Sequence, residues 1–286
     1  MNPIIEAFFN EPTNTVSYLI ADPATGAAAV VDPVLDYDAE DGTVDTGSAE
    51  AILARAAERG WTIGLVLETH VHADHLSAAP LFKLRTGATI GIGERVRDVQ
   101  KVFRPMFGAD DVKEGGGDFD LLFADGERIA LGELVIEVMA VPGHTAADVA
   151  YRVGDAVFVG DSLFMPDYGT ARTDFPGGDA RQLYRSIQRI LALPPETRLF
   201  MCHDYKAPGR DQFRWETTVA EQRAANVHLA GNSEDEFVAM REARDATLAT
   251  PKLLLPAIQV NIRAGRFPPA EANGVSYLRI PVNVRG

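Results

Sequence analysis

The sequence contains a single cysteine, Cys202, among its 286 residues. No disulfide can therefore form within the chain, which is typical of proteins that fold in a reducing compartment. The first residues lack the basic stretch and apolar core of an export signal, and no apolar run approaches the roughly 18 residues that a membrane-spanning helix needs. We therefore expect a cytoplasmic protein that does not enter a membrane.

Positive charge is also scarce. The chain has 27 Lys and Arg against 41 Asp and Glu, which gives a formal net charge of -14. Such a chain repels phosphate backbones and anionic membrane surfaces at long range. Nucleic acid is therefore not an expected partner. The hydrophobic share of 46% is that of an ordinary globular protein with a substantial core.

The part of the chain before residue 210 alternates strand and helix signals. A helix is predicted from Ser48, as its N-cap, to Gly60 just past its end, and others over residues 77–85 and after Asp179. Short apolar runs predict strands over residues 16–20, 28–32, 63–67, 134–139, 156–160 and 198–202. Each of the last four is followed by a polar residue or cluster, and such strand ends are where α/β folds place functional sites.

The sequence changes character near residue 210. Ser233 and Glu236 form a capping box that predicts a helix toward Thr247, and four later prolines interrupt the chain. We expect a catalytic domain over residues 1–210 and a C-terminal helical and loop extension over residues 211–286 that packs on the same domain.

The strongest chemical signal is a histidine cluster that follows one of these strands. Three of the six histidines are His70, His72 and His75, with Asp74 between them. Side chains two apart in an extended segment point the same way, so imidazole and carboxylate ligands gather as zinc, iron or manganese requires. Further ligands are available after three later strands, namely His144, Asp161 and His203.

This pattern of HxHxDH followed by His, Asp and His resembles the metallo-β-lactamase superfamily, in which Asp32 matches a structural aspartate. The resemblance implies an α/β fold, an αβ/βα sandwich of four layers. Within the superfamily the chain resembles the persulfide dioxygenases, also called sulfur dioxygenases. The matching segments are residues 69–75, 142–145, 160–164, 169–175 and 202–205, and residues 233–237 and 259–265 resemble bacterial members with a longer C-terminus.

The resemblance implies one Fe(II) per chain, held by His70, His144 and Asp161. It further implies that glutathione persulfide and O2 react there, with sulfite and glutathione as products. Arg172 and Tyr205 are predicted to bind the substrate and, with Asp74, to serve catalysis. A homodimer is also expected. The remaining motif residues are predicted not to bind the iron, but to support its ligands or to bind a second metal. They are His72, Asp74, His75 and His203.

Other functions remain open at this point. All ligands of a dinuclear zinc site are present, so a glutathione-thioester hydrolase of the glyoxalase II type with two Zn(II) per chain is the main alternative. A non-catalytic metal-binding protein or a di-iron electron-transfer protein is an alternative of another class, although the latter usually carries Glu in place of His72. Cys202 is either a redox-sensitive thiol or a small buried strand residue.

Overall fold

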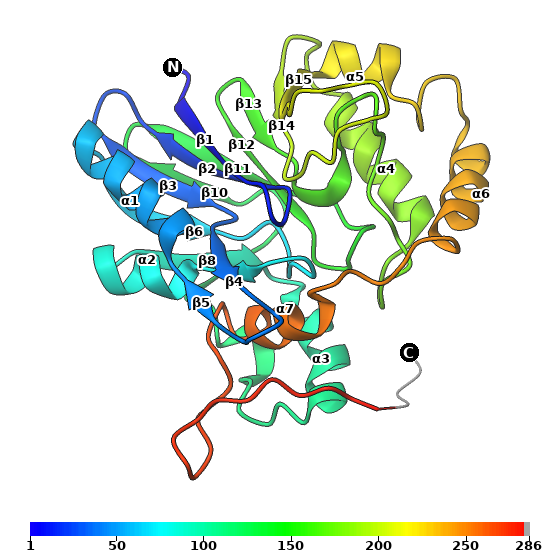
Figure 1. The fold of residues 1–286 in the computed structure, drawn as a ribbon. Coiled ribbons are helices and arrows are strands. Elements are labelled where there is room, and N and C mark those ends of the chain that lie inside the picture. Colours follow the sequence, from blue (N-terminus) through cyan, green and yellow to red (C-terminus); the bar gives the residue numbers. More distant parts are fainter. Residues whose placement is uncertain (283–286) are drawn as a thin grey trace.

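The computed structural model describes residues 1–282. Two six-stranded sheets face each other, with the strand orders β1-β2-β3-β6-β8-β9 and β10-β11-β12-β13-β14-β15 (Figure 1). The strands of the first are Ile4–Asn10, Thr15–Ala21, Ala27–Val31, Thr62–Leu67, Thr89–Gly93 and Leu121–Phe123, and those of the second are Arg128–Leu131, Leu134–Ala140, Val149–Val153, Ala156–Phe158, Arg198–Phe200 and Glu216–Thr218. A small third sheet has the order β5-β4-β7, from Val44–Asp45, Val34–Tyr37 and Leu76–Ser77.

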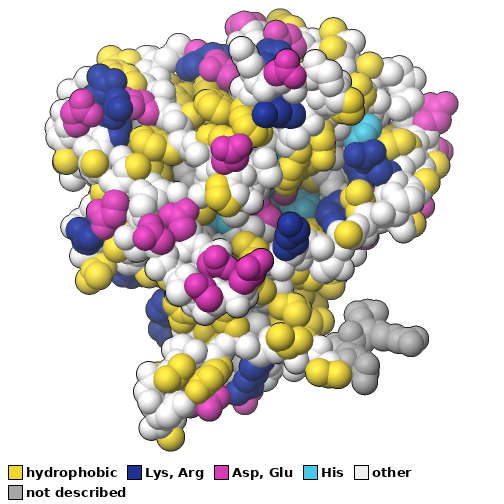
Figure 2. Space-filling model, in the orientation of Figure 1, with side chains coloured by type: hydrophobic (Ala, Val, Ile, Leu, Met, Phe, Trp, Pro, Cys, Tyr) yellow, Lys and Arg dark blue, Asp and Glu magenta, His cyan; other side chains and the backbone are white. Residues whose placement is uncertain are grey.

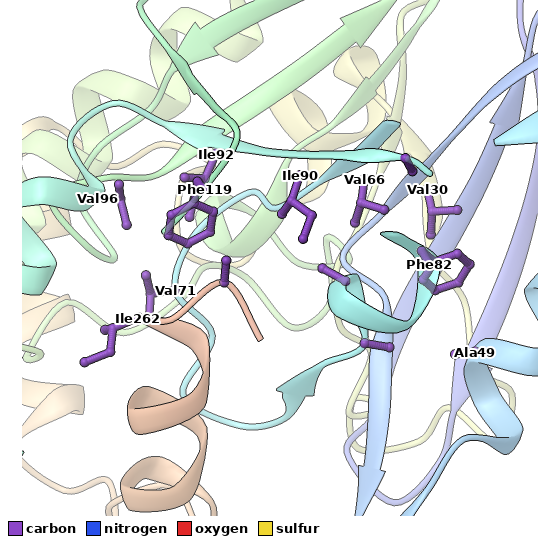
Figure 3. Close-up of a cluster of buried hydrophobic side chains, with 14 of the residues drawn as sticks. Val30, Ala49, Val66, Val71, Phe82, Ile90, Ile92, Val96, Phe119 and Ile262 are labelled. Carbon is purple, nitrogen blue, oxygen red and sulfur yellow. The ribbon is translucent and has the colours of Figure 1, made fainter. Parts of the chain in front are cut away.

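Apolar side chains pack in three places: between the two sheets, and between each sheet and the helices that cover it. Between the sheets, Tyr18 of β2 packs on Phe158 of β13 and Phe200 of β14. A second cluster lies between the first sheet and its covering helices, where Val30, Val66 and Ile90 meet Phe82 (Figure 3). These helices are α1 Gly47–Arg59, α2 Ala79–Thr86 and α3 Val96–Phe107.

The outer face of the second sheet is covered in the same way. Its cluster joins Val157 and Leu199 of the sheet to Ile187 of α4 and Phe237 of α6. The helices of this half of the chain are α4 Ala180–Leu191, α5 Val219–Ala225, α6 Glu234–Asp245 and α7 Leu254–Asn261. Helices thus cover the outer faces of two packed sheets, which confirms the four-layer αβ/βα sandwich expected from the sequence.

The predicted helix boundaries are partly correct. Asp179 caps α4 by accepting a hydrogen bond from the Gln182 N–H, and Ser233 opens α6 with the expected capping box. The prediction that Ser48 caps the first helix is wrong, because α1 already begins at Gly47. The Asp36 carboxylate accepts hydrogen bonds from both the Ser48 N–H and the Ser48 hydroxyl, so a residue distant in sequence does the capping. Similarly, Ser77 lies in β7 and α2 begins at Ala79.

The chain after residue 210 takes part in both halves of the sandwich. Strand β15 pairs with β14 at the edge of the second sheet, and α6 packs beside α4. Helix α7 lies on the other half, where Ala257 and Val260 contact Leu76 (Figure 1). In residues 1–282 every helix is too short or too polar to cross a membrane.

Candidate metal centre

Four strands from the two sheets bring the predicted ligands to one place. The HxHxDH segment follows β6 of the first sheet, whereas His144 follows β11, Asp161 follows β13 and His203 follows β14. Strands β11 and β13 both run antiparallel to β12, and β13 is parallel to β14, so their carboxyl ends lie at the same edge.

Two glycines permit the close approach of these segments. A Cβ on Gly143 would lie 2.3 Å from the Leu183 Cα in α4, and a Cβ on Gly160 would lie 2.8 Å from the Thr69 side chain. Gly160 also has a φ of 52°, which favours glycine. His144 and Asp161, the residues that follow these glycines, are thereby held against the rest of the centre.

The histidines are oriented through one ring nitrogen each. Nδ1 of His70 contacts the Thr69 hydroxyl at 3.0 Å, and Nδ1 of His144 contacts the Arg172 carbonyl at 2.8 Å. Nδ1 of His75 and Nδ1 of His203 likewise contact backbone carbonyls. In these four histidines the other ring nitrogen, Nε2, faces the centre. Fixing one ring nitrogen by a hydrogen bond is how proteins orient metal-binding histidines.

Several buried polar atoms at the centre have no hydrogen-bond partner among residues 1–282. Because an unpaired buried donor or acceptor costs about 1–3 kcal/mol, such a concentration needs an explanation. All are nitrogen or oxygen atoms of the kind that bind borderline metal ions, so a metal fits the residues present. They are Nε2 of His70, His75 and His203, Nδ1 of His72 and Oδ1 of Asp161.

Among the candidate donor atoms, one group contains Asp161 and another lies within the HxHxDH segment. His70, His144 and Asp161 each offer one atom, and these atoms lie within 4.8 Å of one another. His72, Asp74 and His75 form another such group. His203 Nε2 lies 3.2 Å from Asp74 Oδ2 and 3.4 Å from Asp161 Oδ1. The structure thus brings all seven predicted metal-site residues together.

His72 is held differently from its neighbours. Its Nε2 lies 2.9 Å from Asp32 Oδ1 and 3.4 Å from Glu68 Oε2, both buried. Burial disfavours a charged imidazole, but the two carboxylates outweigh it and raise the pKa of His72 well above its usual value. Asp32 also accepts hydrogen bonds from the N–H and hydroxyl of Thr69. Glu68 carries no distinguishing sequence signal, because it is simply the residue that precedes Thr69.

Burial has the opposite effect on the other histidines of the segment. It lowers the pKa of His70 well below its usual value and that of His75 to about 4, with the nearby His72 acting in the same direction. Both imidazoles are therefore neutral near pH 7, the form that binds a metal.

A cavity of about 950 Å³ opens onto the centre, with Asp74, His144 and Asp161 in its wall. Figure 2 shows histidine atoms at the bottom of a hollow in this face, bordered by acidic and basic side chains. Among the residues that line the cavity, the acidic ones other than Asp74 and Asp161 come from the segment around β4 and β5, and the basic ones come mostly from the chain after residue 240. These acidic residues are Asp36, Asp38, Glu40 and Asp45, and the basic residues are Arg172, Arg241, Arg244 and Lys252.

Arg172 and Tyr205, the predicted substrate contacts, both line this cavity. The Arg172 guanidinium donates to both carboxylate oxygens of Asp174 and to the Ala249 carbonyl, so most of its donors are engaged within the protein. Tyr205 stacks on His203, with ring centroids 5.5 Å apart, and is 38% exposed. Partial burial, with Asp74 and Asp161 nearby, raises its pKa well above 10 and keeps the phenol protonated.

Two residues of the site carry no local sequence signal. Arg244 and Lys252 are single basic residues in ordinary contexts, yet they reach the cavity. Neither forms an ion pair within residues 1–282.

Cys202 is 2% exposed, and burial raises the pKa of its thiol well above its usual value. Cys202 is thus a small buried residue, as one of its two interpretations held, but it lies just past β14, which ends at Phe200, and not in the strand.

Several known proteins are similar to this chain. A probable metallo-hydrolase of Burkholderia pseudomallei is 53% identical, with 98% of this chain and 99% of that protein aligned. Glyoxylase B2 of Dictyostelium discoideum is 44% identical over 98% of this chain and 97% of its own length. A beta-lactamase hydrolase-like protein of Agrobacterium fabrum is 52% identical, and this chain spans 65% of its length.

Among solved structures, ETHE1 from Myxococcus xanthus matches with a TM-score of 0.74 and 34% identity, over 92% of this chain and 100% of that chain. The family model described as the metallo-beta-lactamase superfamily matches residues 10–203, the span that runs from the end of β1 to the last predicted ligand. Fold, ligand pattern and family model agree, and the chain belongs to the metallo-β-lactamase superfamily.

Proposed function

We propose that the protein is a non-haem iron dioxygenase that oxidises glutathione persulfide with O2 to sulfite and glutathione. The observation that carries this is the buried group His70, His144 and Asp161, two imidazoles and one carboxylate converging beside a cavity. Two histidines and one carboxylate with open positions are the ligand set of non-haem Fe(II) oxygenases. Bound there, Fe(II) would supply the redox chemistry that joins O2 to sulfur.

The similarity to ETHE1, a persulfide dioxygenase, supports the proposal because it extends over nearly the whole chain. The cavity supports it as well. Glutathione carries two carboxylates and one ammonium group, and the cavity has both a basic and an acidic side. Arg244 and Lys252 are placed to bind the carboxylates, and the acidic residues near β4 are placed to bind the ammonium.

The protein's own residues have defined tasks in this reaction. Tyr205 stays protonated, so it can donate a hydrogen bond into the cavity beside His203. Arg172, anchored by Asp174, orients His144 through its carbonyl. Phe164, Tyr168 and Phe175 give the cavity an apolar lining that limits water near the sulfur. The catalytic assignments of Asp74, Arg172 and Tyr205 stay predictions.

The second candidate is a dinuclear zinc hydrolase of glutathione thioesters. The group formed by His72, Asp74 and His75, with His203 between Asp74 and Asp161, favours it because these atoms could hold a second metal. The relatives named as a metallo-hydrolase and a glyoxylase also agree with it. Two metal ions would then generate hydroxide as the nucleophile.

The deciding experiment purifies the protein without oxygen, measures bound metal, and compares two reactions. We expect one iron per chain and oxygen uptake on glutathione persulfide, without hydrolysis of S-lactoylglutathione. Two zinc ions with thioester cleavage and no oxygen uptake would instead establish the hydrolase. Bound metal with neither reaction would favour the electron-transfer or non-catalytic alternative. The cytoplasmic location and the homodimer stay predictions.

A further inference from the structure

The metal-binding segment has little structure of its own. Residues 70–75 belong to no helix or strand, and within residues 1–282 their N–H and C=O groups form no hydrogen bond with another backbone group. The segment is nevertheless buried except for Asp74, and it carries four of the seven candidate ligands. Its shape must therefore be held by side chains from elsewhere.

One side chain supplies most of this support. The Asn261 carboxamide donates to the His72 carbonyl at 2.9 Å and to the His75 carbonyl at 2.8 Å. Its oxygen accepts from the Ser77 N–H at 2.9 Å. Asn261 is 4% exposed, and both of its amide protons and its carbonyl oxygen are directed at residues 72–77.

Asn261 is itself held by the packing of the chain around it. It is the last residue of α7, and the following Ile262 lies near Val71 in the core (Figure 3). Gly265 approaches the start of α2 so closely that a Cβ there would lie 2.6 Å from Pro80. The carboxamide is thus presented by a rigid element, as a positioning group requires.

We propose that Asn261 is a positioning residue of the metal centre, which sets the shape of residues 70–77 and thereby the geometry of the ligands. The C-terminal extension is then a working part of the centre, although it contributes no ligand. This inference rests on the presence of a metal at the centre and not on which reaction the metal serves. It therefore survives if the dioxygenase proposal fails and the hydrolase alternative holds.

Gln259, in the same helix, offers a matched control. It is 2% exposed, and its carboxamide is also fully bonded, to the Leu255 carbonyl and to the backbone of Arg279. None of its partners belongs to the metal centre. Asn261→Leu and Gln259→Leu each replace a satisfied buried amide by an apolar group, so both are expected to lower the thermal stability of the metal-free protein to a similar extent.

The test titrates the metal-free proteins with Co(II) alone and follows the visible absorption of the bound ion together with chelator competition. We expect Asn261→Leu to bind Co(II) about 10- to 100-fold more weakly than the natural chain, with an altered spectrum. Gln259→Leu is expected to bind Co(II) like the natural chain. Equal affinity and identical spectra for the two variants would overturn the proposal.

Asn261→Asp covers the case in which the leucine variant does not fold. The aspartate keeps the oxygen that accepts from Ser77 and has nearly the same size, but it cannot donate to the carbonyls of His72 and His75. We expect the same direction of change in Co(II) affinity and spectrum. Unchanged Co(II) binding in this variant would also refute the positioning role.

Discussion

His144 connects the metal centre to the wall of the substrate cavity. Its Nε2 lies 3.6 Å from Asp161 Oδ2, while its Nδ1 is fixed by the carbonyl of Arg172. A change at this residue therefore affects both the metal and the segment that carries Arg172 and Asp174. It is the sharpest single test of the ligand assignment.

We predict that His144→Ala loses most of its bound iron, because the triad is reduced to one imidazole and one carboxylate. Metal analysis of anaerobically purified protein checks this. His228→Gln is the control, since His228 is a half-buried histidine that bonds to Thr170 and belongs to none of the metal groups. If His144→Ala keeps its iron and its full activity, His144 is not a ligand.

Arg244 and Lys252 test the charge pattern of the cavity. Both are exposed and positively charged, so each is expected to contribute no more than about 1 kcal/mol to binding a carboxylate. We predict that Arg244→Ala and Lys252→Ala each raise KM about 2- to 5-fold and the double variant about 10-fold, with kcat unchanged. Steady-state kinetics with glutathione persulfide measure this.

The matched control for the charge prediction is Lys101→Ala, which removes an exposed lysine of α3 that lies outside the cavity. It should leave KM unchanged. The cavity charges would have no role in binding if the double variant showed the same KM as Lys101→Ala. A fall in kcat alone would place these residues in the reaction step and not in binding.

At the scale of elements, α4 and the end of β11 are fitted to each other through Gly143. A side chain at this position would overlap the backbone of Leu183 in α4, so the strand end and the helix can approach only with glycine. Since His144 follows directly, the helix position and the position of one candidate ligand are coupled.

We predict that Gly143→Ala lowers the free energy of unfolding by about 2 kcal/mol or more and reduces metal content, because the Cβ forces α4 and the His144 turn apart. Urea denaturation and metal analysis measure the two effects. Gly209→Ala is the control: it also has a positive φ, 90°, but its Cβ would meet open space. Equal losses in both variants would show that backbone strain alone is responsible.

Elements also show where sequence reasoning succeeds and where it stops. The ligands could be predicted because each follows an apolar strand, a local pattern of a few residues. Asn261 could not, since its partners lie at residues 72–77 and nothing near residue 261 indicates them. The predicted start of α1 was wrong for the same reason. Asp36 of β4, and not Ser48, accepts the hydrogen bond from a backbone N–H at the beginning of this helix.

At the scale of the whole molecule, His228 joins segments of the C-terminal half. It follows α5, and its Nδ1 accepts a hydrogen bond from the Thr170 N–H, near the cavity. Burial, together with the charges of Arg241 and Arg244, lowers the pKa of His228 from 6.5 to about 4. Folding therefore keeps this imidazole neutral.

The sign of the pH effect follows from this shift. Between pH 6.5 and 4 the unfolded chain binds a proton at residue 228 that the folded chain does not, so the stabilisation is complete above pH 6.5 and is lost as the pH falls. The free energy of unfolding should fall between pH 7.5 and pH 5 in both proteins. We predict that this fall is about 1 kcal/mol smaller in His228→Gln than in the natural chain, a figure that allows for the partial exposure of His228. Urea denaturation at both values measures it, and parallel losses would contradict it.

The order of the chain has a consequence for how the enzyme matures. The candidate ligands begin at His70 and end at His203, and the residue that shapes their segment, Asn261, comes later still. His70 precedes Asn261 by 191 residues, so at a synthesis rate of about 5–20 residues per second the first histidines leave the ribosome roughly 10–40 seconds before the centre can close. Metal loading is thus a late event for each new chain, and an incomplete chain exposes histidines without a shaped site to hold the ion.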